Sequence, residues 1–433
     1  MDRNHLRMAP EIWGGLECTI NRIGDTFRDQ LHYCRHYTRP GDIDHIANLG
    51  IRALRYPVLW ERHQPVKDQA IDWSWAEQQL KKICSHNIRP IAGLVHHGSG
   101  PAYTNLLSDS FASGLADYAL QVAKRFPWLE YFTPVNEPLT TARFSGLYGF
   151  WYPHKANAYS FAVMLLNQVK GIVLAMQSIR RINPAAKLVQ TEDLTKIHST
   201  SLLQYQADFE NERRWLTYDL LCGRVTREHP LWEYLISLGI KESQLFFFTE
   251  HTCVPEIMGL NYYVTSERYL DEDLTSYPAH THGGNGIHAY ADVEAVRAIK
   301  PAGIKKLLQE AWNRFHLPVA ITEAHLNCDE IEQARWFKEI WDACCGAVRN
   351  GVEVKGVTAW SLLGAYDWES LLTKNEQVYE SGVFDISNGI VQPTLTASLI
   401  ASLARQGCCD HPLLNQKGWW HHNSRLIKAA DLF

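Results

Sequence analysis

Short apolar runs rich in β-branched residues alternate with longer amphipathic segments along the whole chain. This alternation is typical of βαβ units and a parallel sheet. Strands are expected over residues 11–18, 51–58, 89–97, 129–137, 186–193, 256–264, 317–323 and 355–363. Helices are expected between them, for example over residues 74–87, 111–126, 158–184 and 331–351, several ending at Asn, Gly or Pro. The pattern predicts an α/β fold, a closed (β/α)₈ TIM barrel.

The barrel is expected to form a single domain over residues 1–405, followed by a tail of unassigned role over residues 406–433. A doubly wound open sheet competes, but no G-x-G-x-x-G follows the first strand. The polar segment 270–290 should form a long loop over the barrel mouth. In the tail, Trp419 and Trp420 either cover the barrel bottom or bind another chain, and the sequence leaves both alternatives open.

The composition excludes some classes of partner. With 42 basic and 47 acidic residues, the net charge is -5, and no basic block stands out that could neutralise a row of phosphates. Nucleic acid is therefore not an expected partner. The chain has 15 Trp and 19 Tyr, and aromatic faces are surfaces on which sugar rings stack, although most Trp residues belong to cores.

The ten Cys show no C-x-x-C pair with metal spacing, so they are expected to be buried, reduced thiols. The N-terminal residues lack the apolar run of a signal peptide. No later stretch is expected to approach the length that spans a bilayer. These features predict a soluble cytoplasmic protein.

Two carboxylates stand where a barrel builds its active site, at the C-terminal ends of strands. Glu137 ends the fourth predicted strand within TPVNEP, and Glu323 ends the seventh within AITEA. A lone glutamate at a strand end is usually just solvated. Strands four and seven face each other across a barrel, however, and retaining cleavage of a glycoside requires two carboxyls roughly 5 to 5.5 Å apart. The pair therefore indicates glycoside chemistry.

Five segments, TPVNEP, AITEA, LRYPVLWERHQP, MGLNYY and WSLLGAYDW, make the chain from residue 11 to about residue 404 resemble glycoside hydrolase family 1, the β-glucosidase and β-galactosidase family. TPVNEP is similar to its T-x-N-E-P acid/base motif, and AITEA to the first half of its I-T-E-N-G nucleophile motif. The resemblance implies a retaining β-glycosidase that hydrolyses terminal β-linked sugars by double displacement. Glu137 would be the acid/base and Glu323 the nucleophile, and no metal or organic cofactor is required.

The resemblance also assigns supporting residues. Arg55 and Tyr263 would lie against Glu323 and favour its ionised form, and Asn136 would hydrogen-bond the sugar 2-hydroxyl. The sugar contacts that it implies are Glu17, His96, Asn136, Tyr263, Trp360, Asp367 and Trp368. Seen alone, Arg55 is also explained as an ordinary ion-pair partner, Tyr263 as a core ring, and His96 and Trp360 as packing.

This chain departs from the family at positions that select the sugar. Glu17 stands where the family has Gln, His97 where it has Trp, and Asp367 where it has Glu before the final Trp. Ala324 and His325 replace the Asn and Gly after the nucleophile. The expected glycone is therefore something other than plain glucose.

Two alternatives remain open. One is a transglycosidase that uses the same glutamates but transfers the sugar to a lipid or another sugar. The other is a catalytically inactive carbohydrate-binding barrel, suggested by the departures at Glu17, His97, Ala324 and Asp367. In all three cases the expected partner is a β-glycoside, and the chain could form a homo-oligomer.

Overall fold

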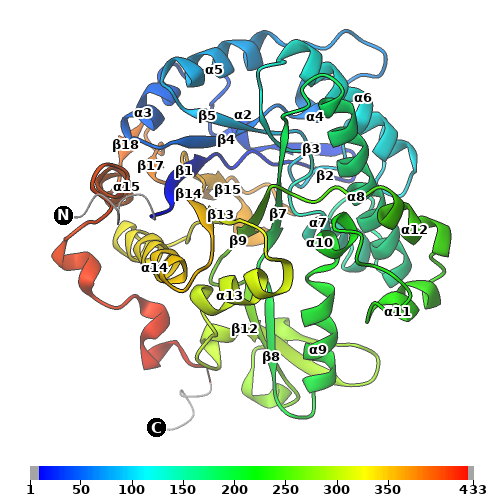
Figure 1. Ribbon diagram of the computed structural model, residues 1–433. Coiled ribbons are helices and arrows are strands. Elements are labelled where there is room, and N and C mark those ends of the chain that lie inside the picture. Colours follow the sequence, from blue (N-terminus) through cyan, green and yellow to red (C-terminus); the bar gives the residue numbers. More distant parts are fainter. Residues whose placement is uncertain (1–8, 428–433) are drawn as a thin grey trace.

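Eight parallel strands form a closed barrel in the computed structural model, which describes residues 9–427 (Figure 1). The strands are β1 (Glu11–Gly15), β4 (Ala53–Pro57), β5 (Arg89–Gly93), β6 (Tyr131–Thr133), β7 (Lys187–Asp193), β9 (Ile257–Asn261), β13 (Val319–Ala324) and β14 (Val354–Ala359). Neighbours in the ring follow chain order, and β1 pairs with both β4 and β14. The predicted TIM barrel is confirmed, and every barrel strand overlaps its predicted range.

The strands read as continuous apolar runs because both of their faces are covered. In β4, β9 and β13 every residue is buried. The lower interior of the barrel is filled by a cluster that includes Trp13, Ile91, Val189 and Ala320. A Cβ at Gly356 would lie 2.4 Å from Trp13 Cε2, so the indole fits there only because residue 356 is glycine.

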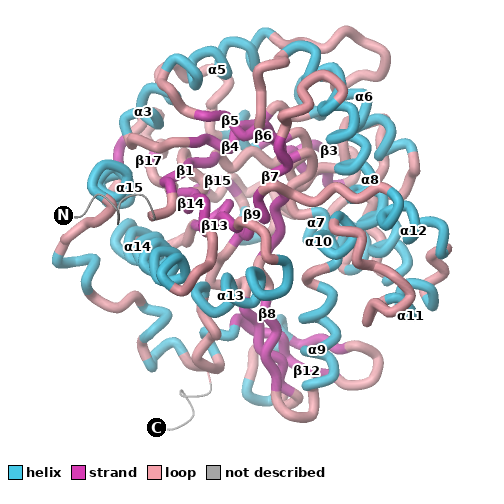
Figure 2. Tube along the Cα trace, in the orientation of Figure 1, coloured by secondary structure: helices cyan, strands magenta, loops and turns pink. Residues whose placement is uncertain are grey.

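Helices cover the outside of the barrel, as the cyan tube around the magenta strands shows (Figure 2). The longer ones are α5 (Ser74–Ser85), α6 (Ser110–Arg125), α8 (Ala158–Arg180), α9 (Gln204–Arg213), α12 (Glu242–Glu250), α13 (Ile304–Phe315), α14 (Glu330–Arg349) and α15 (Leu395–Gln406). The shorter ones are α2 (Gln30–Tyr33), α3 (Asp42–Asn48), α4 (Trp60–His63), α7 (Pro138–Ala142), α10 (Leu216–Leu221) and α11 (Trp232–Ser237). The expected end signals are present, since the Asp329 carboxylate accepts from the first amides of α14 and α15 stops at Gly407 with φ 73°.

Helix α8 corrects one expectation. Its 23 residues are long and apolar enough, by length and composition, to cross a membrane, so the prediction that no stretch approaches such a length was wrong. Within the structure, 78% of its apolar window is buried, and the helix packs against α6. It is explained as a core helix of the barrel's outer layer.

The segment 270–290 does not form the long irregular loop that the sequence predicted. Instead, β8 (Lys196–Ser199), β10 (Glu267–Asp271), β11 (His282–Gly284) and β12 (Ala289–Glu294) form a second sheet in the order β11-β12-β10-β8. These strands are short, and their buried apolar residues, such as Ile197, Leu270 and Val293, are too few in each strand to give a clear alternation. After β12 the chain turns through η4 (Ala295–Arg297).

The tail packs against α14 and does not cover the bottom of the barrel (Figure 1). Trp420 is buried, and its ring lies 5.1 Å from that of Trp336, edge to face. Neither of the two predicted roles describes Trp420, because its contacts lie on an outer helix of its own chain. Residues 1–8 of the predicted barrel domain and residues 428–433 of the predicted tail lie outside the described residues.

All ten cysteines are free, as predicted. Cys18, Cys34, Cys253 and Cys344 are buried, but the predicted burial is wrong for Cys84 and Cys408, which are exposed. Cys84 lies near the end of α5, on the solvent side of this outer helix.

Candidate active site

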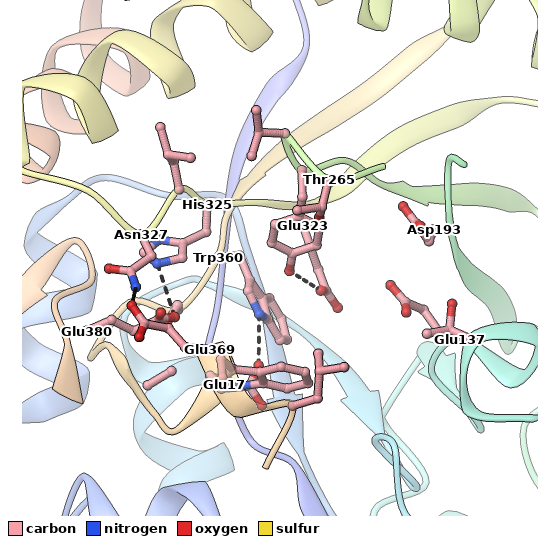
Figure 3. A pocket seen from close by; sticks show the side chains of 18 of the residues that line it. Glu17, Glu137, Asp193, Thr265, Glu323, His325, Asn327, Trp360, Glu369 and Glu380 are labelled. Carbon is pink, nitrogen blue, oxygen red and sulfur yellow. Dashed lines mark hydrogen bonds and ion pairs between the residues drawn. The ribbon is translucent and has the colours of Figure 1, made fainter. Parts of the chain in front are cut away.

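A cavity of about 430 Å³ opens at the C-terminal ends of the barrel strands. Among its lining residues, Asp193 and Glu323 lie in the ends of β7 and β13, while Glu137, Tyr263 and Trp360 follow β6, β9 and β14 (Figure 3). Its volume lies in the range of small-molecule sites. The barrel thus places the predicted glutamates in one concave site.

Glu137 is held in a strained backbone conformation at the barrel rim. It precedes α7 with φ 44°, in the left-handed region that a non-glycine residue seldom adopts. Its amide donates to the Thr191 carbonyl at 3.2 Å, and Pro138 starts the helix. Asn261 Nδ2 donates to Glu137 Oε1 at 2.5 Å, while Asn261 Oδ1 accepts from the Thr322 hydroxyl. The second contact fixes the amide orientation that serves Glu137.

Glu323 receives two strong donors. Arg55 Nη1 donates to Glu323 Oε1 at 2.8 Å, and the Tyr263 hydroxyl donates to Oε2 at 2.5 Å. Glu323 is buried, and the Arg55 side chain beside it is only 5% exposed. Both supporting residues therefore lie against Glu323, where the sequence predicted them, and neither is a distant core group.

The two carboxyls have unequal surroundings. Burial raises the pKa of Glu137 well above its ordinary value, and the charges of Glu323 and Asp193 raise it further. Burial also raises the pKa of Glu323, but the Arg55 cation and the Tyr263 hydrogen bond oppose that rise. Burial and the Glu323 charge raise the pKa of Tyr263, so its phenol keeps the donated proton. A single proton on the pair therefore resides on Glu137.

Trp360 forms an aromatic floor. Its ring stacks on His96 with centroids 5.2 Å apart and planes 16° apart, and the Arg55 guanidinium lies 4.5 Å from its centroid. A Cβ at Gly15 would lie 2.4 Å from Trp360 Cε3, so glycine there leaves the space that the indole fills. Burial lowers the pKa of His96 well below its ordinary value, which makes this histidine a neutral ring.

Asn136 connects the floor to Glu323. Its Oδ1 accepts from Arg55 Nη2 at 2.7 Å and from the Thr191 hydroxyl at 2.8 Å. Its Nδ2 lies 3.4 Å from His96 Nε2 and 3.2 Å from His97 Nε2. Arg55, His96 and Asn136 surround a smaller hollow beside Trp360, so the structure brings all three close to Glu323.

The structure does not bring every predicted contact into the cavity. Of the predicted catalytic and sugar-contact residues, those that line it are Glu17, Glu137, Tyr263, Glu323, Trp360 and Trp368. His97, one of the positions expected to select the sugar, also lines it. Asp367 does not line it, because its carboxylate oxygens accept from the amides of Gln377 and Val378 at 3.1 and 2.9 Å and hold a turn. Trp368 Nε1 is buried and has no hydrogen-bond partner within the described part of the chain.

Glu17 is a buried carboxyl on the cavity wall. Oε1 accepts from the Thr19 amide at 2.9 Å, and Oε2 accepts from Trp360 Nε1 at 3.2 Å. Burial, together with the Glu323 charge, raises the pKa of Glu17 to about 7. Near neutral pH it therefore carries a proton about half of the time, and in that state it resembles the amide that the family has there.

Replacing Glu17 by glutamine should make folding less sensitive to pH. The raised pKa means that the stability contribution of Glu17 is present below its ordinary value of 4.5 and is lost as pH rises through about 7. The loss amounts to about 3 kcal/mol at most. We expect Glu17→Gln to shift the melting temperature upward, relative to the parent, by a few degrees more at pH 8 than at pH 5. An equal difference at both pH values would contradict this explanation.

Other lining residues were not predicted. Asp193 ends the fifth predicted strand, so the strand-end rule points to it. Asn261, which lies within MGLNYY, does not line the cavity but donates to Glu137. Glu369, Glu380, His325 and Asn327 gather on the side of the cavity near Glu17 (Figure 3). Glu369 lies in η5 (Trp368–Ser370), Glu380 in the two-residue strand β16 (Tyr379–Glu380), and the other two follow β13, so none of them ends a predicted strand. Between residues 9 and 427 no group of three or more His, Cys, Asp or Glu residues is placed to hold a metal ion.

Comparison with known proteins finds relatives and solved structures that are β-glucosidases or phospho-β-glucosidases. The aryl-phospho-β-D-glucosidase BglC of Bacillus subtilis is 22% identical over 388 residues, covering 77% of this chain and 78% of that protein. β-Glucosidase 47 of Arabidopsis thaliana is 21% identical and covers 94% of this chain and 81% of its own length. The β-glucosidase from Thermotoga maritima in complex with azafagomine superposes with a TM-score of 0.75 at 16% identity, covering 93% of this chain and 98% of that chain.

The family model described as Glycosyl hydrolase family 1 matches residues 21–376. This range contains Glu137 and Glu323, the floor residue Trp360 and all but the first strand of the barrel. The chain belongs to glycosyl hydrolase family 1.

Proposed function

We propose that this chain is a retaining β-glycosidase that hydrolyses terminal β-linked sugars. The observation that carries the proposal is the unequal environment of two buried carboxyls in one cavity. Glu323 has a cation and a phenol against it, whereas Glu137 has no cation: an amide donates to it, the neutral ring of His97 lies 3.8 Å away, and its charged neighbours are acidic. That arrangement suits an ionised nucleophile beside a protonated acid.

In the first step, Glu323 forms a bond to the anomeric carbon while the bond from that carbon to the aglycone oxygen breaks. Glu137 transfers its proton to the departing oxygen, so the aglycone leaves as a neutral alcohol. The sugar remains as an ester of Glu323, whose negative charge disappears. Because that charge is one cause of the raised pKa of Glu137, the Glu137 carboxyl is easier to ionise in the ester.

In the second step, Glu137 accepts a proton from water, and the water oxygen bonds to the anomeric carbon as the ester bond breaks. The sugar leaves with its original anomeric configuration, and both carboxyls return to their starting states. We assign Trp360 as the surface beneath the ring and Asn136 as the partner of the 2-hydroxyl, in line with the position of its Nδ2 beside His96 and His97.

The charge of the cavity favours an unphosphorylated sugar. Besides the catalytic pair, its walls carry the carboxyls of Glu17, Asp193, Glu294, Glu369 and Glu380. Within the described chain, the lining contains one arginine, Arg297, and no lysine. A phosphate dianion near these carboxylates would be repelled in a partly desolvated site. One relative is named for phosphorylated aryl glucosides and another is a β-glucosidase. The acidic walls favour a substrate without phosphate.

We expect kcat/KM for a 4-nitrophenyl β-glucoside to exceed that for its 6-phosphate by at least about 100-fold, equivalent to about 3 kcal/mol of repulsion. Release of nitrophenol at low and high ionic strength measures this ratio. Salt should narrow it, because screening weakens the repulsion. A preference for the phosphorylated substrate would contradict the charge argument while leaving the glycosidase assignment intact.

The experiment that tests the function is a panel of 4-nitrophenyl α- and β-glycosides, including deoxy and amino sugars. We expect release of 4-nitrophenol from the β-glycosides only. NMR should show that the sugar product keeps the anomeric configuration of the substrate. Methanol added as acceptor separates hydrolysis from transglycosylation, because a transglycosidase would form methyl glycoside in place of most free sugar. Binding of sugars by calorimetry without any turnover would support an inactive carbohydrate-binding barrel and overturn the proposal.

A further inference from the structure

The tail that follows α15 reaches the cavity that holds Glu137 and Glu323, which Trp419 helps to line. After α15 the tail runs beside α14 and ends, within the described residues, next to η4 (Figure 1). Ile427 donates its amide proton to the Arg297 carbonyl at 2.9 Å, and Arg425 Nη2 donates to the Ile299 carbonyl at 3.2 Å. The tail is therefore fastened to the segment that follows the second sheet.

A second set of contacts fixes the short helix η7 (Trp419–His421) on α14. Trp420 is 4% exposed, donates through Nε1 to Glu339 at 2.9 Å and packs edge-on against Trp336. The amide of Trp419 donates to Glu332 at 3.1 Å. These contacts hold the backbone of Trp419 in place, so its side chain is presented by a rigid support.

The Trp419 side chain lines the same cavity as Glu137 and Glu323. The Arg297 guanidinium lies 4.4 Å from the centroid of its ring, and the Trp420 ring stands edge-on at 6.0 Å. These two neighbours restrict the indole, which remains only partly buried. A partly exposed indole held by a cation and a second aromatic ring is a ready surface for another flat ring.

We propose that Trp419 binds the aglycone of the substrate and that this aglycone is a planar aromatic group. The inference rests on the proposed glycosidase function. A sugar on Trp360 between the two glutamates leaves the rest of the cavity for the aglycone, and the lining of that cavity includes Trp419 and Arg297. An aryl group there stacks on the indole, whereas a small alkyl group has no flat ring that could stack.

The test compares two substrates that share one sugar, an aryl β-glycoside and the methyl β-glycoside. Each variant is compared with the parent on the same substrate, so the intrinsic reactivity of the leaving group cancels. We expect Trp419→Leu to lower kcat/KM for the aryl glycoside about 3- to 10-fold, the range that one aromatic contact supports. The methyl glycoside should change less than about twofold, and Trp419→Phe should restore most of the aryl activity.

The matched control is Trp128→Leu. Trp128 is 45% exposed, is not among the residues that line the cavity, and follows α6. This control variant should leave kcat/KM unchanged for both substrates. If Trp419→Leu lowers kcat/KM equally for both substrates, or for neither, the inference is overturned. An equal loss of kcat/KM together with a lower melting temperature would show that Trp419 only supports the structure. If the parent chain hydrolyses no glycoside at all, the proposed function itself fails.

Discussion

Glu323→Gln is expected to abolish release of phenol from aryl β-glycosides, lowering kcat by at least about 10⁴-fold, as the loss of a covalent nucleophile does in other enzymes. The glutamine amide is neutral and cannot form the ester. It still fits between Arg55 and Tyr263, which now donate to Glu323 at 2.8 and 2.5 Å. The measurement is single-turnover and steady-state release of 4-nitrophenol from the folded variant.

A second variant separates loss of chemistry from loss of structure. In Glu323→Gly, a small anion such as azide can occupy the vacated space and attack the anomeric carbon from the same side as the missing carboxylate. We expect azide to restore turnover and to yield a glycosyl azide of inverted configuration. Unchanged hydrolysis by Glu323→Gln, or an azide product of retained configuration, would reject Glu323 as the nucleophile.

Glu137→Gln is expected to lower kcat/KM about 10²- to 10⁴-fold for glycosides with poor leaving groups, which is the usual range for general acid catalysis. The loss should be smaller for dinitrophenyl glycosides, whose phenolate departs without a proton. The glutamine would still contact Asn261, the present hydrogen-bond donor to Glu137. A plot of log(kcat/KM) against leaving-group pKa should become steeper in the variant, and an unchanged slope would exclude Glu137 as the acid.

The pH profile of the parent follows from the same pair. Activity requires Glu323 ionised and Glu137 protonated, so kcat/KM falls at low pH as Glu323 gains a proton and at high pH as Glu137 loses one. Because burial raises the pKa of both groups and that of Glu137 most strongly, both limbs should lie above the ordinary range of a glutamate. The apparent pKa values of the two limbs belong to the coupled pair and not to either residue alone. Glu137→Gln should remove the alkaline limb.

The sequence predicted the barrel because parallel strands are buried on both faces and appear as apolar runs, as in β9 and β13. It also located Glu137 and Glu323, since strand ends supply the catalytic residues of a barrel. Partners such as Arg55, far from Glu323 in sequence, came only through the family resemblance. Contact between them depends on strand order around the closed ring, which local pattern does not contain.

The remaining differences have local physical causes. The second sheet was missed because its strands are short, and because β11 consists of His282, Gly283 and Gly284, whose side chains give no strand signal. Asp367 was expected to contact the sugar, yet its carboxylate holds a turn. The position of Trp419 depends on how a short tail without periodicity crosses α14, and that path is set by contacts with Glu332 and Glu339.

Closure of the barrel has a consequence for the chain during its synthesis. β1 is hydrogen-bonded to β14, with Glu11 opposite Gly356. The first strand to leave the ribosome must therefore wait, with one edge unpaired, until nearly the whole protein has been made. A nascent or prematurely terminated chain exposes that edge and invites intermolecular pairing. Products truncated before Val354 should accumulate as aggregates or be degraded, even though they already contain Glu137 and Glu323.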